Sequence, residues 1–394
     1  MALLSSPAAI VPHHSRRFCR LPLSPSLVYS LPHRTLFSNT AIMATDVAPA
    51  ATAPSDLPVR TKETENQSVD IVATYHSLVE DADLTKPVAA IEALITLLNA
   101  SGTTTVYETL DLVKRHSKLL HASVKNPVPL QAGTDLFLQY LVSSLKQQES
   151  GAVDTSPHQS FEAVRTHLLR NGRLFASRAI TARDRIADAG WRLIRDGKVV
   201  LTHGASRAVS SLLFKAAEQF GGGANGSGVR FKVVYVRDEH RPAESDRVVK
   251  ELREKGIPVA EIAEPAVAHV LGLLRQVHMV FVGAEAVTQN GGIISRMGTY
   301  QIAKLAKQVG LPFYVAAESH KFARKLVIDQ RDLGFQQHVL DFKTVGASEQ
   351  PEDAVDYTPP DLISYLVTEN GVKLPTYVFE QLLEIYGSFG SLDV

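Results

Sequence analysis

The chain has 394 residues, 45% of them hydrophobic, a length that exceeds one ordinary core and predicts two domains. Basic and acidic residues balance at 41 each, so the overall charge favours neither nucleic acid, nor a membrane surface, nor an acidic substrate. No apolar run reaches the roughly 18 residues that span a bilayer. The single cysteine, Cys19, excludes a disulfide framework and fits a reducing compartment.

The first 67 residues are expected to be a leader and a disordered N-terminal tail outside the folded body. Residues 1–42 contain four arginines and seven serines but no acidic residue, which is typical of an organelle transit peptide. The same composition suits an upstream extension of the reading frame, with translation starting at Met43. Residues 43–67 are rich in small residues and proline and are predicted to be disordered.

Residues 68–196 predict a helical bundle of antiparallel neighbours. Thr85 can cap a helix that carries Pro87 in its first turn, where a missing N–H costs nothing. The apolar face of this helix is formed by Val88, Ile91, Leu94, Ile95 and Leu98. A second helix is predicted to begin near Thr104 or Thr105, after the break at Ser101–Gly102.

The rest of this region also predicts helices, and it shows no strand pattern. A third helix is predicted from Thr134, and two more are predicted over about 157–171 and 173–196. The last two carry eight arginines against three acidic residues. They are Arg165, Arg170, Arg173, Arg178, Arg183, Arg185, Arg192 and Arg195.

Two interpretations of these arginines stay open. They can form a solvated helix face with internal ion pairs. Alternatively, because the planar guanidinium group suits phosphate and carboxylate, they can form a face for a phosphorylated or acidic protein partner. The candidates for such a face are Arg165, Arg170, Arg173, Arg178, Arg183 and Arg185.

Residues 197–394 predict a Rossmann-like α/β domain. Short β-branched segments at 198–204, 230–239, 257–263, 277–285 and 311–319 alternate with helical patterns, as expected for a parallel sheet with right-handed crossovers. In such a sheet the site lies beyond the carboxyl ends of the strands. No glycine-rich dinucleotide or P-loop motif and no metal-spaced Cys/His cluster occurs, so we expect no nucleotide cofactor and no metal.

Four segments together identify a family resemblance. They are VLTHGASRAV (200–209), VFVGAEAVTQNGGIISRMGTYQIAKLAK (280–307), PFYVAAESHKF (312–322) and VDYTPPDLISYLVTENGVKLPT (355–376). They resemble the alpha subunits of eukaryotic translation initiation factor 2B, a family that is related to methylthioribose-1-phosphate isomerase and ribose-1,5-bisphosphate isomerase. The resemblance covers roughly residues 70–394 and is strongest after 197.

The resemblance implies that the chain has lost the isomerase chemistry. The related isomerases read T-H-C-N after their first strand, with the cysteine as acid and base, and use an aspartate in a G-A-D segment. Gly204 stands at the cysteine position here and Glu285 at the aspartate position. Proton transfer between C1 and C2 needs two groups that exchange protons, and glycine offers none. We therefore expect no enzyme activity.

A sugar-phosphate pocket can outlive that chemistry. We expect His203 and Glu285 beside it, with Asn290, Gly291, Gly292 and Arg296 contributing backbone N–H groups and a cation. The helical region would add Gly102, Thr103 and Thr104 as a second anion contact. Alternatively, Asn290–Gly292 is only a tight turn. Arg296 replaces a lysine of the isomerase motif, which keeps the cation and changes the geometry.

The resemblance further implies a non-catalytic regulatory subunit of the guanine-nucleotide exchange factor for translation initiation factor 2. Its partners would be the beta, gamma, delta and epsilon subunits, a second copy in a homodimer, and initiation factor 2 phosphorylated on its alpha subunit. The expected location is the cytosol. Two alternatives are kept: an active aldose–ketose isomerase, and a protein whose sugar-phosphate ligand tunes assembly. The apolar C-terminal end packs on its own domain or completes a subunit interface.

Overall fold

The computed structural model describes the chain from residue 69 to 387, with gaps. The described residues are 69–81, 84–103, 105–149, 166, 170, 174, 177–178, 181–221, 228–273, 276–340, 342, 345–346, 351 and 353–387. They all belong to one compact unit, 64–394. The predicted leader and tail, 1–67, lie outside the described residues. We refer to residues 69–149 as the helical half and to residues 181–387 as the α/β half.

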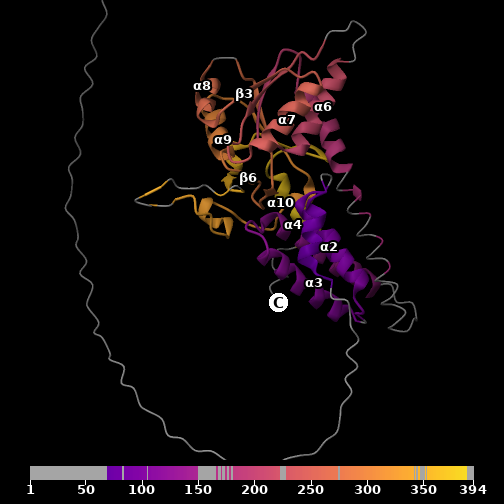
Figure 1. Cartoon of the computed structure of the whole chain (residues 1–394). Coiled ribbons are helices and arrows are strands. Elements are labelled where there is room, and N and C mark those ends of the chain that lie inside the picture. Colours follow the sequence, from indigo (N-terminus) through magenta and orange to yellow (C-terminus); the bar gives the residue numbers. More distant parts are fainter. Residues whose placement is uncertain are drawn as a thin grey trace, which may run out of the picture. The chain divides into compact units, whose positions relative to one another are not determined.

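The helical half consists of α1 (Ile71–Val79), α2 (Lys86–Ala100), α3 (Val106–Ala122) and α4 (Val128–Glu149). Helix α2 begins after Thr85 with Pro87 in its first turn, as predicted, and it is buried among its neighbours. Helix α3 begins with a capping box in which the Thr105 hydroxyl accepts from the Glu108 N–H and the Glu108 carboxylate accepts from the Thr105 N–H. Figure 1 shows α2, α3 and α4 grouped on one side of the α/β half.

Helix α4 begins at Val128, six residues before the start predicted at Thr134. Gly133 favoured a later start in the sequence, because glycine weakens a helix interior. The structure gives the reason for this glycine. A Cβ atom at Gly133 would lie 2.5 Å from the Pro87 carbonyl oxygen, so only glycine allows α4 to approach the start of α2 this closely.

A seven-stranded sheet forms the centre of the α/β half, with the strand order β10-β9-β7-β4-β1-β2-β3. Its strands are β1 (Val199–His203), β2 (Lys232–Val236), β3 (Val259–Ile262), β4 (Met279–Gly283), β7 (Phe313–Ala316), β9 (Tyr365–Thr368) and β10 (Gly371–Lys373). Every pairing is parallel except that of β10 with β9. The predicted α/β fold with a parallel sheet is confirmed, and each of the five predicted strand segments contains a strand.

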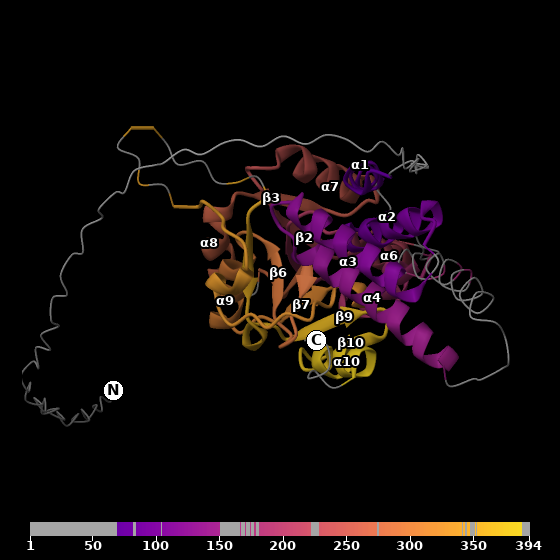
Figure 2. The same cartoon turned by 90° about the horizontal axis from the view of Figure 1, so that it is seen from below.

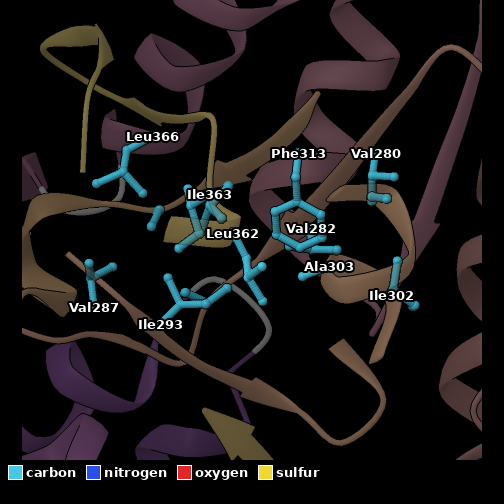
Figure 3. Packing of buried hydrophobic residues seen from close by; sticks show 14 of the residues in the cluster. Val280, Val282, Val287, Ile293, Ile302, Ala303, Phe313, Leu362, Ile363 and Leu366 are labelled. Atoms are coloured by element: carbon cyan, nitrogen blue, oxygen red, sulfur yellow. The ribbon is translucent and has the colours of Figure 1, made fainter. Parts of the chain in front are cut away.

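Helices cover both faces of this sheet. Helices α6 (Arg207–Gly221) and α7 (Pro242–Glu254) share one apolar cluster with the helical segment 181–190. Helices α8 (Val267–Gly272), α9 (Thr299–Gln308) and α10 (Tyr377–Tyr386) share the cluster on the opposite face. Figure 3 shows part of that second cluster, where Phe313 of β7 and Ile302 of α9 lie among valines and leucines.

The packing bears on the predicted helical domain and on the C-terminal end. The sequence places segment 181–190 in the helical domain, yet Ile186 and Ala187 pack into the core of the α/β half, beside α6. The domain boundary at 196/197 stays a prediction. The apolar C-terminal end packs on its own chain, because Val378, Leu382 and Tyr386 of α10 are buried.

A small antiparallel sheet, in the order β5-β6-β8, lies between the large sheet and the helical half. It consists of β5 (Ala286–Val287), β6 (Ile293–Arg296) and β8 (Val355–Thr358), none of which the sequence predicted. Val128 and Ala132 of α4 pack on its residues Ile294 and Val355. Short 3-10 turns connect these elements: η1 (Trp191–Leu193), η2 (Glu264–Ala266), η3 (Ser319–Lys321), η4 (Gln330–Leu333) and η5 (Pro360–Leu362).

Candidate functional site

A cavity of about 690 Å³ lies at the carboxyl edge of the large sheet, where the helical half meets it. The segments after β1 and β4 form its floor, through Gly204–Ser206 and Gly283–Glu285. The N-terminal ends of α2, α6 and α7 all line it, and Figure 2 shows these three helices on the same side of the molecule. Because helix N-termini carry partial positive charge, these three helix ends favour anionic groups at the cavity.

Glu285 is the carboxylate at the centre of this cavity wall. Its Oε2 lies 3.1 Å from Lys86 Nζ and accepts from Asn126 Nδ2 at 3.3 Å, while its Oε1 lies 3.5 Å from Arg296 Nε. Burial alone would raise the pKa of Glu285, but Lys86 and Arg296 outweigh burial and hold the pKa below its ordinary value. Glu285 is therefore ionised at neutral pH and is a weak base.

Arg296 fills the space beside Gly204. Gly204 has a left-handed φ of +80°, and a Cβ atom added there would lie 3.1 Å from Arg296 Cγ. The Arg296 guanidinium also approaches Glu244 of α7, with 3.7 Å between Nη2 and Oε2. Its Nη1 is buried and has no hydrogen-bond partner among the described residues. A buried guanidinium N–H without an acceptor is costly, and this nitrogen suits an oxygen of a bound ligand.

A second buried carboxylate, Glu318, lies at the end of β7. Its Oε2 lies 2.7 Å from Lys321 Nζ, and Arg183 Nε lies 3.8 Å from its Oε1. Burial would raise the pKa of Glu318, but Lys321 overcomes burial and lowers the pKa to about 2. The neighbouring His320 is also buried, which lowers its pKa to about 4, and its Nε2 hydrogen-bonds the Thr85 hydroxyl at 2.9 Å. His320 is therefore neutral at pH 7.

The structure separates the predicted pocket residues. Glu285 and Arg296 meet in the cavity, whereas His203 turns away from it. His203 Nε2 lies 3.0 Å from the Met297 carbonyl oxygen, and the ring lines a different cavity of about 390 Å³ with Asp238 and Glu264. The predicted pairing of His203 with Glu285 around one ligand has no geometric support in the described residues.

Asn290, Gly291 and Gly292 form the turn between β5 and β6 and do not line the cavity. The Asn290 side-chain amide donates to the Val327 carbonyl at 2.7 Å and to the Tyr357 hydroxyl at 2.9 Å. These contacts satisfy the side-chain donors within the fold. The arrangement matches the alternative of a tight turn.

The predicted second anion contact lies far from the cavity. Gly102 and Thr103 follow the C-terminal end of α2, whereas the N-terminal end of this helix lines the cavity. A helix of 15 residues is about 22 Å long, so the two sites are a helix length apart. Thr104 lies outside the described residues.

The predicted arginine face is only partly described. Arg165 and Arg173 lie outside the described residues. Arg170, Arg178 and Arg185 are exposed, whereas Arg183 is only partly exposed and lines the cavity beside Glu318. The arginines therefore do not share a single environment, and Arg183 belongs to the cavity.

Sequence reasoning missed Lys86 and Asn126, the two groups from the helical half that contact Glu285. They lie 199 and 159 residues before it in the chain, and no local pattern joins positions so far apart. One signal was present, because Lys86 occupies the first turn of a helix whose capped start was predicted.

The described residues contain neither a candidate metal site nor a candidate membrane span. Among them, no three His, Cys, Asp or Glu side chains are grouped closely enough to hold a metal ion. No described helix combines the length and the apolar character that crossing a bilayer requires.

The fold and the site define an α/β protein with a cavity of paired cations and carboxylates at the carboxyl edge of a mostly parallel sheet, closed by an N-terminal helical half. The pattern of the Initiation factor 2 subunit family matches residues 79–375, about three quarters of the chain. The chain belongs to this family.

Named relatives agree with this assignment. The chain is 31% identical to translation initiation factor eIF2B subunit alpha of Dictyostelium discoideum, over 80% of this chain and 96% of the relative. It is 35% identical to a ribose 1,5-bisphosphate isomerase of Archaeoglobus fulgidus, over 59% and 72% of the two chains. A chain of the tetrameric eIF2B-beta2-delta2 complex from C. thermophilum shares the fold, with a TM-score of 0.61, 19% identity and coverage of 80% and 94%. The likeness to alpha subunits supports the expected regulatory subunit of initiation factor 2B.

Proposed function

We propose that this chain is a non-catalytic regulatory subunit of the exchange factor for translation initiation factor 2, and that it acts in complex with the beta, gamma, delta and epsilon subunits. The observation that carries the non-catalytic part is the pair Gly204 and Arg296. Gly204 has no proton-exchanging group, and the Arg296 side chain occupies the space where such a group would project. Glu285 pairs with Lys86 and Arg296, and Gly204 offers it no thiol partner.

Turnover assays test the absence of catalysis. The purified chain at high concentration is incubated with ribose 1,5-bisphosphate and with methylthioribose 1-phosphate. We expect no conversion, and also none after Gly204→Cys alone, because the new side chain meets Arg296 and the backbone there is left-handed. Conversion by the wild-type chain that is abolished by Glu285→Gln would overturn the proposal in favour of an active isomerase.

A native pull-down with the full tagged chain tests the regulatory role. We expect the four other subunits in one large assembly, together with a second copy of this chain. Recovery of a bare homodimer under mild lysis would count against the proposed complex.

Sequencing the mature N-terminus and locating the tagged chain in fractionated cells tests the proposed cytosolic location, since plastid or mitochondrial import would contradict it.

Sensing of phosphorylated initiation factor 2 is the task that we propose for the arginine-rich segment 165–195. Three arginines of the described residues support this task, because Arg170, Arg178 and Arg185 are exposed. A phosphoserine carries about −1.5 to −2 charges and three acceptor oxygens, which guanidinium groups bind well. A triple substitution of these arginines by glutamine should weaken binding of the phosphorylated factor about tenfold or more and leave binding of the unphosphorylated factor unchanged. Equal loss for both forms would contradict the assignment.

A sugar-phosphate ligand is a second candidate function, favoured by the buried Arg296 Nη1 and by the three helix N-termini at the cavity. Ribose 1,5-bisphosphate at millimolar concentration should raise the melting temperature, because a ligand that binds only the folded state stabilises it. Arg296→Met should abolish this shift. A wild-type chain whose melting temperature does not respond would exclude the ligand.

A further inference from the structure

Glu285 has partners on both sides of the junction between the two halves. Lys86 at the start of α2 and Asn126 between α3 and α4 belong to the helical half, and they lie 3.1 and 3.3 Å from Oε2. Arg296 of β6 belongs to the α/β half and lies 3.5 Å from Oε1. The carboxylate is 15% exposed and Lys86 is 37% exposed, so water screens the Lys86 side of this contact more than the Glu285 side.

The length of the side chain decides whether the junction is bridged. By resemblance the related isomerases carry aspartate at this position, and glutamate adds one methylene, about 1.5 Å of reach. With an aspartate, the 3.1 Å contact with Lys86 would open to roughly 4.5 Å, beyond hydrogen-bond distance. The extra methylene thus carries the carboxylate from the floor of the cavity across to the helical half.

We propose that Glu285 is a positioning residue that latches the helical half onto the carboxyl edge of the large sheet. Two further hydrogen bonds flank this latch: Thr85 with His320, and the Arg207 guanidinium with the Leu84 carbonyl oxygen at 2.9 Å. The apolar packing of α4 on the small sheet holds the halves together, and the charged contacts of Glu285 add directional bonds at the cavity end of the junction.

This inference deepens the proposed regulatory function, because a helical half in a fixed orientation offers partner subunits a defined surface. The latch itself is measurable on the purified chain without any partner. A failed pull-down with an intact latch would overturn the regulatory role alone, and an absent latch with a recovered complex would overturn this inference alone.

Hydrogen exchange of the full chain, followed by mass spectrometry, tests the latch. Glu285→Gln keeps the size of the side chain and removes its charge. Amides in the first turns of α2 and α4 should then exchange about tenfold faster, while those of α7 and α9 keep their wild-type rates. Lys250→Met is the matched control, because Lys250 pairs with Glu254 inside α7 and is exposed. Equal exchange in α2 and α4 of wild type and Glu285→Gln would overturn the latch.

Two further variants separate a latch from a local structural role. Glu285→Asp keeps the charge and shortens the reach, so it should loosen α2 as much as Glu285→Gln does. Lys86→Met should give a similar acceleration in the wild-type background and none in the Glu285→Gln background, because both remove the same contact. Wild-type protection in Glu285→Asp, or additive effects of Lys86→Met and Glu285→Gln, would contradict the proposal.

Discussion

The cavity at the edge of the large sheet and the small sheet beside it each hold a buried carboxylate, and the pKa values of the two shift in opposite directions. In the cavity, Lys321 and Arg183 surround Glu318, and the pKa of this carboxyl falls to about 2. On β8, burial raises the pKa of Asp356 to about 7, even though its carboxylate accepts from the Gly298 and Tyr300 N–H groups. Burial is common to both, so the difference comes from the supply of cations.

Charged contacts also distinguish two groups of residues within segment 280–307, one of the four segments that carry the family resemblance. Glu285 and Arg296 face the cavity and meet charged groups from distant segments. Asn290–Gly292 form a turn, and the Asn290 amide donates its hydrogen bonds to Val327 and Tyr357 within the fold. Glu285 and Arg296, which carry charges into the cavity, are therefore the residues that can bind a ligand. Asn290–Gly292 instead shape the turn between β5 and β6, where close packing leaves little room.

The largest expected effect is a loss of stability on substitution of Gly291, in the closely packed turn between β5 and β6. A Cβ atom at Gly291 would lie 2.3 Å from the Pro375 carbonyl oxygen, on a backbone with a left-handed φ of +84°. Gly291→Ala should therefore lower the free energy of unfolding by about 5 kcal/mol, the upper end for one substitution. Denaturant unfolding measures this. Gly102→Ala, in open space, should change stability by less than about 1 kcal/mol. Similar small losses in both variants would refute the steric account.

The next effect concerns Asp356. Because its folded pKa of about 7 lies above the ordinary value of 3.8, its contribution to stability is present below pH 4 and is lost as the pH rises through 7. Asp356→Asn removes this dependence. Its stability relative to wild type should rise by about 1.4 kcal/mol for each pH unit between 4 and 7. Unfolding curves at several pH values check the slope, with Asp111→Asn at an exposed site as the control. A difference that does not vary with pH would contradict the raised pKa.

Glu318 should give a smaller effect of the opposite sign. Its folded pKa of about 2 lies below the ordinary value of 4.5, so its contribution is present above pH 4.5 and is lost as the pH falls through 2. The wild-type chain should lose about 3 kcal/mol over that range relative to Glu318→Gln. Acid unfolding of the two proteins side by side measures the loss. Parallel acid-unfolding curves would show that the cations do not hold this carboxylate in its ionised form.

Sequence patterns located the elements whose signals are local. Thr85 and Pro87 marked the start of α2, and β-branched segments marked five strands of the large sheet. The strands of the small sheet escaped, because two to four residues carry too little alternation to be recognised. The predicted start of α4 is too late. Gly133 lies inside the helix because of its close contact with Pro87, and helix propensity does not reveal such a contact.

The sequence by itself determined the class of fold, the family and the absence of a proton-exchanging group at Gly204. Only the tertiary structure decided that Arg296 fills the space beside this glycine, that His203 faces another cavity, and that Glu285 reaches Lys86 across 199 residues of chain. Periodicity and motif order are properties of neighbouring residues. A charged contact depends on which distant segments the packed core brings together, and on which polar groups remain without partners after that packing.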